Sequence, residues 1–269
     1  MDWSYFEHLM ELSAADRLEE AIQESEDLLA QAENDDDRAS LLAGALMFGL
    51  RLGRLSEARR TLDRMKHLDV SDLEVRLNAE FSETCLLIAE GRIEEGISVS
   101  TEMLRRHHEA LQEDRFRYLY EDLQSRKGLA LVALSRFVEA LPILREAIGF
   151  TFERAPDEQE VRYALGLCLQ ETGDLEGAKR EYYRVIELNL KSEHEERARY
   201  ALARIYCMGG GFAQARRQLE TLLQDRPGPA YAVPREYVYV QLSMACHGLG
   251  DAEGERLYSD LAKSMRERR

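Results

Sequence analysis

The chain has 269 residues, with 36 lysines and arginines against 51 acidic residues, so its formal net charge is −15. Its charged fraction of 32% and hydrophobic fraction of 45% are typical of a soluble folded protein, which excludes a disordered polyampholyte and an integral membrane protein. The acidic balance argues against a nucleic-acid partner, because phosphate contacts need a basic surface.

The sequence carries no recognisable targeting or membrane segment. The start lacks a basic region followed by an apolar one, and the longest uncharged stretch, 237–250, is too short and too polar to span a bilayer. Four widely spaced cysteines lie in apolar helical patterns, where we expect reduced thiols that pack as small hydrophobic groups. They are Cys85, Cys168, Cys207 and Cys246. These features predict a cytoplasmic protein without a membrane partner.

A short pattern repeats along the whole chain: a glycine or similar residue, followed five positions later by a small one. In chain order the pairs are Asp16 with Ala21, Gly53 with Ala58, Gly91 with Gly96, Ser135 with Ala140, Gly173 with Ala178, Gly210 with Ala215 and Gly250 with Glu255. The second members are spaced by 37, 38, 44, 38, 37 and 40 residues. Regular spacing of this size is the signature of a repeat architecture.

Small or apolar residues also recur twelve and nine positions before the second member of each pair, and seven after it. These offsets fall on one face of a helix on either side of the glycine. Glycine supplies the left-handed backbone that ends the first helix, and small residues let the two helices approach. Each unit is therefore predicted to be a helical hairpin that buries its apolar face only by stacking. The sequence predicts an all-α solenoid of about seven hairpins.

Helix starts and breaks can be placed within this frame. Residues 1–37 form an acidic N-terminal hairpin, with thirteen acidic residues, one basic residue and a net charge of −12. The run Asn34–Asp37 suits the positive end of the next helix. Ser71 with Glu74, and Ser192 with Glu195, predict capping boxes. Pro156 is predicted to open a helix, and 105–115 is predicted to be an extended helix or elbow. The proline-rich stretch 227–234 precedes a predicted C-terminal capping hairpin, 236–269.

The fifth unit resembles the tetratricopeptide repeat (TPR) family. It combines Tyr163, Gly166, Leu169, Gly173 and Ala178 at the spacing of that family's signature. The resemblance extends over nearly the whole chain and implies one solenoid domain, 1–269, wound as a right-handed α-α superhelix. In such a superhelix the first helices form a concave inner wall that binds peptides from partner proteins.

The resemblance implies that the inner wall lies fifteen, eleven and eight residues before each small residue. The predicted groove residues are Phe6, Met10, Met47, Leu50, Phe81, Cys85, Tyr163, Leu167, Tyr200, Arg204 and Met244. They are largely apolar, and methionines can repack around different ligands. The set lacks the lysine and asparagine pattern with which chaperone-binding members hold a C-terminal carboxylate. Packing between neighbouring hairpins is the alternative role for any one of them.

No sequence motif indicates catalysis. The HExxH, GxxxxGK[ST] and GxSxG patterns are absent, and His107 and His108 would point about 100° apart on a helix, a poor metal pair. We therefore expect no catalytic residue, metal or cofactor, and predict a non-catalytic scaffold or adaptor that binds a partner peptide or helix. The alternative is a ligand- or peptide-sensing regulator that acts through a partner. The acidic start and the tail 256–269, with a net charge of +3, favour head-to-tail self-association or are simply solvated ends.

Overall fold

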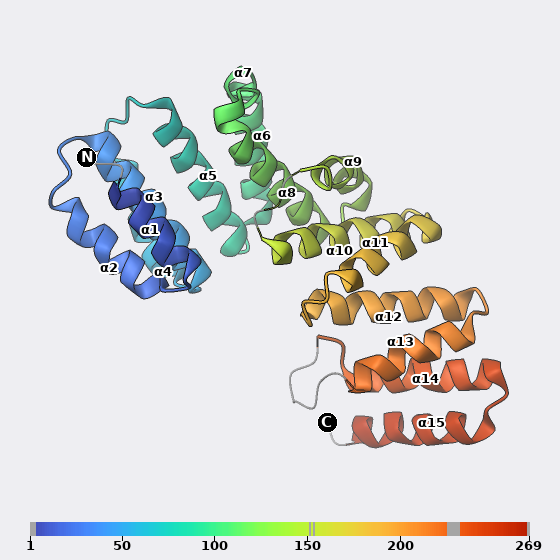
Figure 1. Ribbon diagram of the computed structural model, residues 1–269. Helices are drawn as coiled ribbons and strands as arrows, with labels where there is room; N and C mark the ends of the chain where they lie inside the picture. Colours follow the sequence, from blue (N-terminus) through green and yellow to red (C-terminus); the bar gives the residue numbers. More distant parts are fainter. Residues whose placement is uncertain (1–3, 151, 153, 225–231, 268–269) are drawn as a thin grey trace. The chain divides into compact units, whose positions relative to one another are not determined.

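The computed structural model describes residues 4–150, 152, 154–224 and 232–267, with side chains from Glu7 onward. All regular structure within these ranges is helical, as the sequence predicts, and Figure 1 shows the helices in chain order. The chain divides into two compact units, Met1–Ser135 (unit 1) and Arg136–Arg269 (unit 2). The prediction that the two units form one solenoid domain stays a prediction.

Unit 1 consists of three antiparallel hairpins, a short elbow and one further helix. The helices are α1 (Ser4–Ala14), α2 (Leu18–Leu29), α3 (Asp35–Arg51), α4 (Leu55–Met65), α5 (Leu73–Ala89), α6 (Ile93–Arg106), α7 (His108–Leu111), the 3-10 turn η1 (Asp114–Phe116) and α8 (Arg117–Ala133). The first helices are neighbours, since α3 packs against α5 and α5 against α8. Of the two structures predicted for 105–115, an extended helix or an elbow, the chain has the elbow, because α6 ends at Arg106 and the short α7 and η1 follow. Leu111 and Phe116 anchor it in the core.

Unit 2 begins with a single helix and continues with three hairpins. Its helices are α9 (Phe137–Ala147), α10 (Ala155–Glu171), α11 (Leu175–Glu187), α12 (Glu193–Met208), α13 (Phe212–Gln224), α14 (Arg235–Leu249) and α15 (Ala252–Glu267). Here α12 contacts both α10 and α14. Pro156 stands in the first turn of α10, as predicted. The break at 227–234 lies mostly outside the described residues.

The repeating pair of residues has the geometry that the sequence predicts. All seven turn residues adopt a left-handed backbone, with φ of +58° to +92°: Asp16, Gly53, Gly91, Ser135, Gly173, Gly210 and Gly250. Five of the small residues are at most 1% exposed: Ala21, Ala58, Ala140, Ala178 and Ala215. Gly96 is also buried, whereas Glu255 is half-buried. The alignment of the hairpins is therefore correct along the chain.

The helices that follow the left-handed turns begin in two chemically different ways. In α2, α4, α6 and α9 an arginine pairs with a glutamate three residues later: Arg17 with Glu20, Arg54 with Glu57, Arg92 with Glu95 and Arg136 with Glu139. In α11 and α15 an aspartate accepts a hydrogen bond from a glycine N–H, Asp174 from Gly177 and Asp251 from Gly254. The aspartate form satisfies a free backbone donor directly.

Of the predicted starts of the first helices, those at Asn34 and Ser192 are confirmed and the one at Ser71 is not. Asn34 caps α3 by accepting from the N–H of Asp37 at 2.8 Å, and Ser192 caps α12 by accepting from the N–H of Glu195 at 3.2 Å. The capping box predicted at Ser71 is wrong, because Asp72 caps α5 instead. The Ser71 hydroxyl instead donates to the Asp36 carboxylate at 2.6 Å. A hydrogen bond to a charged acceptor is stronger than the neutral bond that the hydroxyl would accept from a helix N–H.

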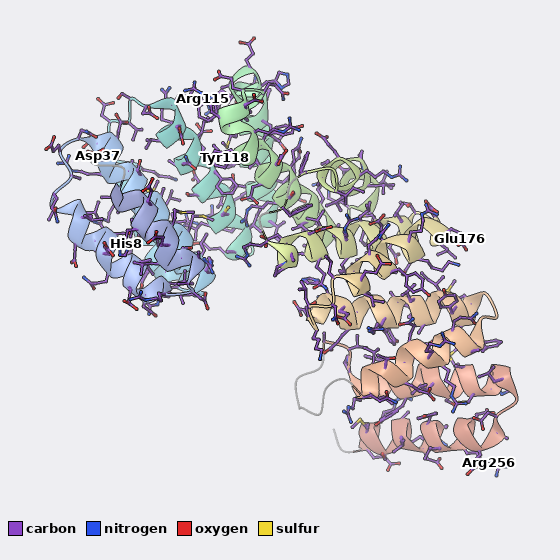
Figure 2. The ribbon with its side chains drawn as sticks, viewed as in Figure 1. His8, Asp37, Arg115, Tyr118, Glu176 and Arg256 are labelled. Atoms are coloured by element: carbon purple, nitrogen blue, oxygen red, sulfur yellow. The ribbon has the colours of Figure 1, made fainter. Side chains whose placement is uncertain are left out.

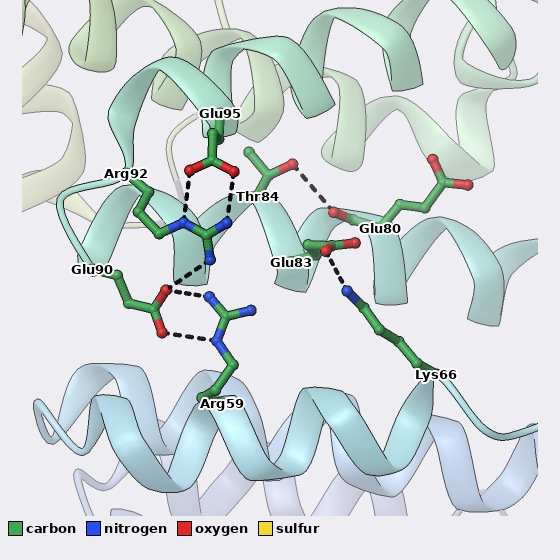
Figure 3. Close-up of polar contacts among 8 residues, drawn as sticks. All are labelled: Arg59, Lys66, Glu80, Glu83, Thr84, Glu90, Arg92 and Glu95. Carbon is green, nitrogen blue, oxygen red and sulfur yellow. Dashed lines mark hydrogen bonds and ion pairs between the residues drawn. The ribbon is translucent and has the colours of Figure 1, made fainter.

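Ion pairs join the hairpins of unit 1 (Figure 3). From α4, Arg59 reaches Glu90 at the end of α5, and Lys66 reaches Glu83 at 2.6 Å. Further pairs connect this hairpin to the acidic first one: Arg51 with Asp16, Arg54 with Glu19 and Arg64 with Glu26. Part of the negative charge of residues 1–37 is therefore neutralised within unit 1.

Neutral as well as charged groups join the hairpins of unit 2 in its described part. Gln159 on α10 is fully buried, donates to the carbonyl of Val185 at 2.9 Å and accepts from the hydroxyl of Ser192. Arg216 reaches Asp251 at 2.8 Å. On α15 the positions that correspond to Arg59 and Lys66 are Arg256, labelled in Figure 2, and Lys263, and both are exposed.

No helix in the described ranges combines the length and hydrophobicity of a bilayer span.

Candidate binding faces

In unit 1 the predicted groove residues come from α1, α3 and α5. We call Met10, Met47, Leu50, Phe81 and Cys85 the unit 1 face. Met10 is 64% exposed, while Met47 and Leu50 are half-buried against the core. The side chain of Phe6 lies outside the described residues. The exposed surface of this face is thus formed mainly by methionine and leucine.

Phe81 and Cys85 are buried rather than exposed. Only 7% of Phe81 and 4% of Cys85 are accessible, and both belong to the apolar cluster that contains Met103 and Phe116. The Arg126 guanidinium lies 5.4 Å from the centre of the Phe81 ring. Burial raises the pKa of the Cys85 thiol to about 12, so this thiol is protonated at neutral pH. Both residues therefore contribute packing and offer little surface to a ligand.

In unit 2 the predicted residues come from α10, α12 and α14. We call Tyr163, Leu167, Tyr200, Arg204 and Met244 the unit 2 face. Leu167, Arg204 and Met244 share one repeat position on three neighbouring helices, with Leu167 half-buried, Arg204 exposed and Met244 51% exposed. The structure thus places a cation between two apolar side chains in one row. Whether this row lines a concave groove stays a prediction.

Aromatic packing holds the α10 side of the unit 2 face. The half-buried Tyr163 ring lies 5.9 Å from the ring of Tyr182 and 5.6 Å from that of His194. Burial raises the pKa of the Tyr163 hydroxyl. Tyr182 is fully buried against Gly166, where an added Cβ would lie 2.6 Å from the tyrosine ring. The missing side chain of Gly166 is therefore what allows this ring to fit between α10 and α11.

Tyr200 and Arg204 stand one helical turn apart on α12. Tyr200 is half-buried and packs against the apolar cluster of Ala203 and Ala245. Burial raises the pKa of the Tyr200 hydroxyl, while the positive charge of Arg204 acts in the opposite direction. Among the described residues, none forms an ion pair with Arg204.

Sequence reasoning missed two exposed apolar residues next to this row. Met208 is 74% exposed and follows Arg204 by four positions on α12, so it belongs to the same helix face. Tyr237, near the start of α14, is 48% exposed. The helical period alone would have identified Met208, whereas nothing in the pattern marks Tyr237.

A hollow of about 370 Å³ lies beside the elbow of unit 1, lined by Leu73 and residues 105–110. Its basic side chains are already paired with acids. Glu80 accepts from Arg106 at 3.1 Å and lies 3.3 Å from His107, while Arg105 pairs with Glu102. These contacts leave the hollow without an unpaired cation of the kind found in the unit 2 face.

No protein-family model matches the sequence, and no curated protein matches it. Solved structures do match the fold. The apo form of the quorum sensor NprR from B. thuringiensis has a TM-score of 0.73 at 15% identity over 96% of this chain and 73% of that one. PilF of Pseudomonas aeruginosa has a TM-score of 0.63 at 15% identity, covering 86% and 93%. YrrB, a TPR protein with an unusual peptide-binding site, has a TM-score of 0.53 at 20% identity, covering 84% and 97%.

The chain therefore has the tetratricopeptide repeat fold, as its sequence resemblance predicts. At these identities the likeness concerns the fold alone.

Proposed function

We propose that this protein is a non-catalytic interaction scaffold that binds a segment of a partner protein on the unit 2 face. The observation that carries the proposal is the row of Leu167, Arg204 and Met244, which stays accessible on three neighbouring helices. In a stacked array most apolar positions at a regular repeat offset are buried by the next hairpin. An accessible row of this kind is a surface available to a partner.

The side chains of the unit 2 face suit an extended or helical peptide. Tyr163 and Tyr200 are fixed by their packing, so they offer aromatic surface at low entropic cost. Met244 and Met208 are exposed and flexible, and they can adapt to the shape of a partner side chain. A peptide laid across α10, α12 and α14 would contact rigid and adaptable groups in turn.

Unit 2 is a better candidate than unit 1 because more of its face is accessible. Phe81 and Cys85 are taken up by the core of unit 1, which leaves Met10 as the one strongly exposed side chain of that face among its described members. Support also comes from the peptide-binding site of YrrB, a protein of the same fold.

Site-specific photocrosslinking tests this proposal. Benzoylphenylalanine would replace Met244 or Leu167 in the full chain, expressed in the cells that make the protein. Arg217, exposed on α13, is the matched control. We expect discrete protein adducts from positions 244 and 167 and none from 217. Adducts from 217 alone, or equal adducts from all three positions, would contradict the assignment.

A peptide-sensing regulator is the second candidate function. The similarity to the quorum sensor NprR, which extends over 96% of this chain, favours it. A sensor must couple peptide binding to a second site with a measurable free energy. Hydrogen exchange separates the two: a peptide bound to unit 2 of a sensor would change exchange in unit 1 as well, whereas a scaffold would show protection at the bound face only.

A further inference from the structure

Arg204 is an exposed arginine whose repeat position lies between two apolar residues of the unit 2 face. Arginines elsewhere are mostly tied to acids: Arg59 to Glu90, Arg162 to Glu158 and Glu181, and Arg199 to the buried Glu195. Arg204 has no such partner within the described part of the chain, a property it shares with exposed arginines such as Arg180 and Arg217, but it alone of these three lies in the apolar row of the unit 2 face. An exposed guanidinium with five donors is therefore available for an external acceptor.

The charge of Arg204 acts on two neighbouring tyrosines. Its positive charge opposes the rise in pKa that burial imposes on both Tyr200 and Tyr182. Tyr200 is on α12 itself, but Tyr182 is on α11 and packs under α10. The charge of Arg204 thus acts on a tyrosine of its own helix and on one of the neighbouring hairpin, where the carboxylate of Glu171 acts on Tyr182 in the opposite direction.

Apolar residues occupy the four positions next to Arg204 in the repeat. Leu167 and Met244 hold the same repeat position on the helices to either side, and Tyr200 and Met208 precede and follow Arg204 by one turn of α12. A carboxylate that pairs with Arg204 here would exclude water together with its apolar neighbours. The ion pair is then stronger than one in open solvent.

Long-range charge also favours an acidic partner at unit 2 over unit 1. Unit 1 has 29 acidic and 16 basic residues, a net charge of −13, whereas unit 2 has 22 acidic and 20 basic residues, a net charge of −2. The strongly negative field of unit 1 repels an approaching carboxylate and lowers its association rate. The nearly neutral unit 2 repels it much less.

We propose that the occupant of the unit 2 face is an internal segment of a partner protein with one aspartate or glutamate between apolar side chains. The carboxylate accepts hydrogen bonds from Arg204, and the flanking side chains contact Leu167 and Met244. Apolar surface on both sides of the cation favours an internal acidic residue over a chain terminus, which would leave one side uncovered. This inference rests on the proposed function of the same face.

Selection from a random peptide library displayed on phage, with the full-length protein as bait, tests the inference. We expect enrichment of a single Asp or Glu flanked by apolar residues. Synthetic peptides with capped ends would then be measured by fluorescence anisotropy with Glu, Gln or Lys at that position. The Glu peptide should bind about tenfold or more tightly than the Gln peptide, since a charge-assisted pair of this kind is worth at least that factor.

Two variants of Arg204 and one control make the result specific. Arg204→Gln should remove the preference for Glu over Gln, and Arg204→Glu should reverse it in favour of the Lys peptide. Arg217→Glu has the same charge change on the exposed side of α13 and should leave the preference intact. Both positions, 204 and 217, are exposed, so folding is not at risk.

The outcomes separate this inference from the proposed function. Selected peptides that bind without an acidic preference, yet lose affinity in Met244→Glu, would overturn the role of Arg204 and keep the face as a binding site. Acidic preference that survives Arg204→Glu would also overturn it. No enrichment of any peptide would overturn both.

Discussion

Units 1 and 2 fold by the same rule but use different groups between their hairpins. Both have left-handed turns and buried small residues at the helix crossing. Unit 1 then joins its hairpins with charged pairs such as Arg59 with Glu90. Unit 2 has a charged pair of this kind in Arg216 with Asp251, but between α10 and α12 it uses neutral groups, Gln159 with Ser192 and Tyr163 beside His194. The comparison shows that the turn and the crossing determine the hairpin, while the surfaces between hairpins are free to diverge. In unit 2 that freedom leaves Arg204 unpaired and accessible.

The largest effect is expected where the two units are alike. Ala58→Glu in unit 1 and Ala178→Glu in unit 2 each force a carboxylate into a crossing that is at most 1% exposed. Burial of an unpaired charge costs several kcal/mol, roughly 3–5 for an ion left without its partner, so each variant should lose most of its unit's stability.

Urea unfolding followed by circular dichroism measures this loss. Ala213→Glu, on the exposed side of α13, is the control. If Ala178→Glu unfolds at the same urea concentration as the wild type, Ala178 does not lie at a buried helix crossing.

Removal of Gln159 tests the neutral contact of unit 2. Gln159→Leu leaves the Val185 carbonyl and the Ser192 hydroxyl without their buried partner. An unsatisfied buried polar group costs about 1–3 kcal/mol, and this loss should not depend on salt because no net charge is involved. Urea unfolding at 0.05 and 1 M NaCl would show it, and a loss that disappears in high salt would contradict the expectation.

Two glycine substitutions should have opposite signs. Gly166→Ala places a Cβ 2.6 Å from the Tyr182 ring, and overpacking of this kind costs about 1–3 kcal/mol. Gly49→Ala in unit 1 places its Cβ 3.9 Å from that of Ala58, an ordinary contact, and a helical alanine gains about 0.5–1 kcal/mol over glycine. Thermal unfolding of the two variants gives the comparison, and stabilisation by Gly166→Ala would show that Tyr182 does not occupy the space.

The smallest effect concerns the ion pair of Arg59 and Glu90. The Arg59 guanidinium holds the pKa of the Glu90 carboxyl below its ordinary value. A lowered pKa in the folded state stabilises unit 1 above the unfolded pKa of about 4.3, and this contribution is lost as the pH falls through the folded value.

A double-mutant cycle of Arg59→Met and Glu90→Gln should give a coupling of about 0.5–1 kcal/mol at pH 7 and low salt. It should shrink below pH 4 and in 1 M NaCl. A coupling that is unchanged at pH 3 would exclude the charged pair.

The hairpins could be predicted from sequence because a local rule defines them. Glycine at a left-handed turn and a small residue five positions later, such as Gly173 with Ala178, fix each hairpin within a few residues. Asp16 and Ser135 occupy the same backbone conformation without being glycine, and the register of their neighbours identified them.

Contacts between hairpins were harder to predict because they depend on side chains distant in sequence. The sequence predicts Ser71 as a helix cap, but its hydroxyl donates a hydrogen bond to Asp36, which lies 35 residues earlier in the chain. The unit 1 face was predicted to line a groove, yet Phe81 and Cys85 are buried in one apolar cluster with the elbow residue Phe116. The elbow is not part of the repeat, so the repeat spacing could not predict where Phe116 lies. In unit 2 the accessible row follows the repeat, so Leu167, Arg204 and Met244 could be identified, but the absence of an acid beside Arg204 is visible only in three dimensions.

Hydrogen–deuterium exchange on the full chain, with and without a saturating peptide from the library selection, tests the central claim most directly. The account predicts slower exchange in α10, α12 and α14 of unit 2, with α11 and α13 unchanged. Protection confined to α11 and α13, or to unit 1, would show that the partner binds elsewhere and would contradict the account.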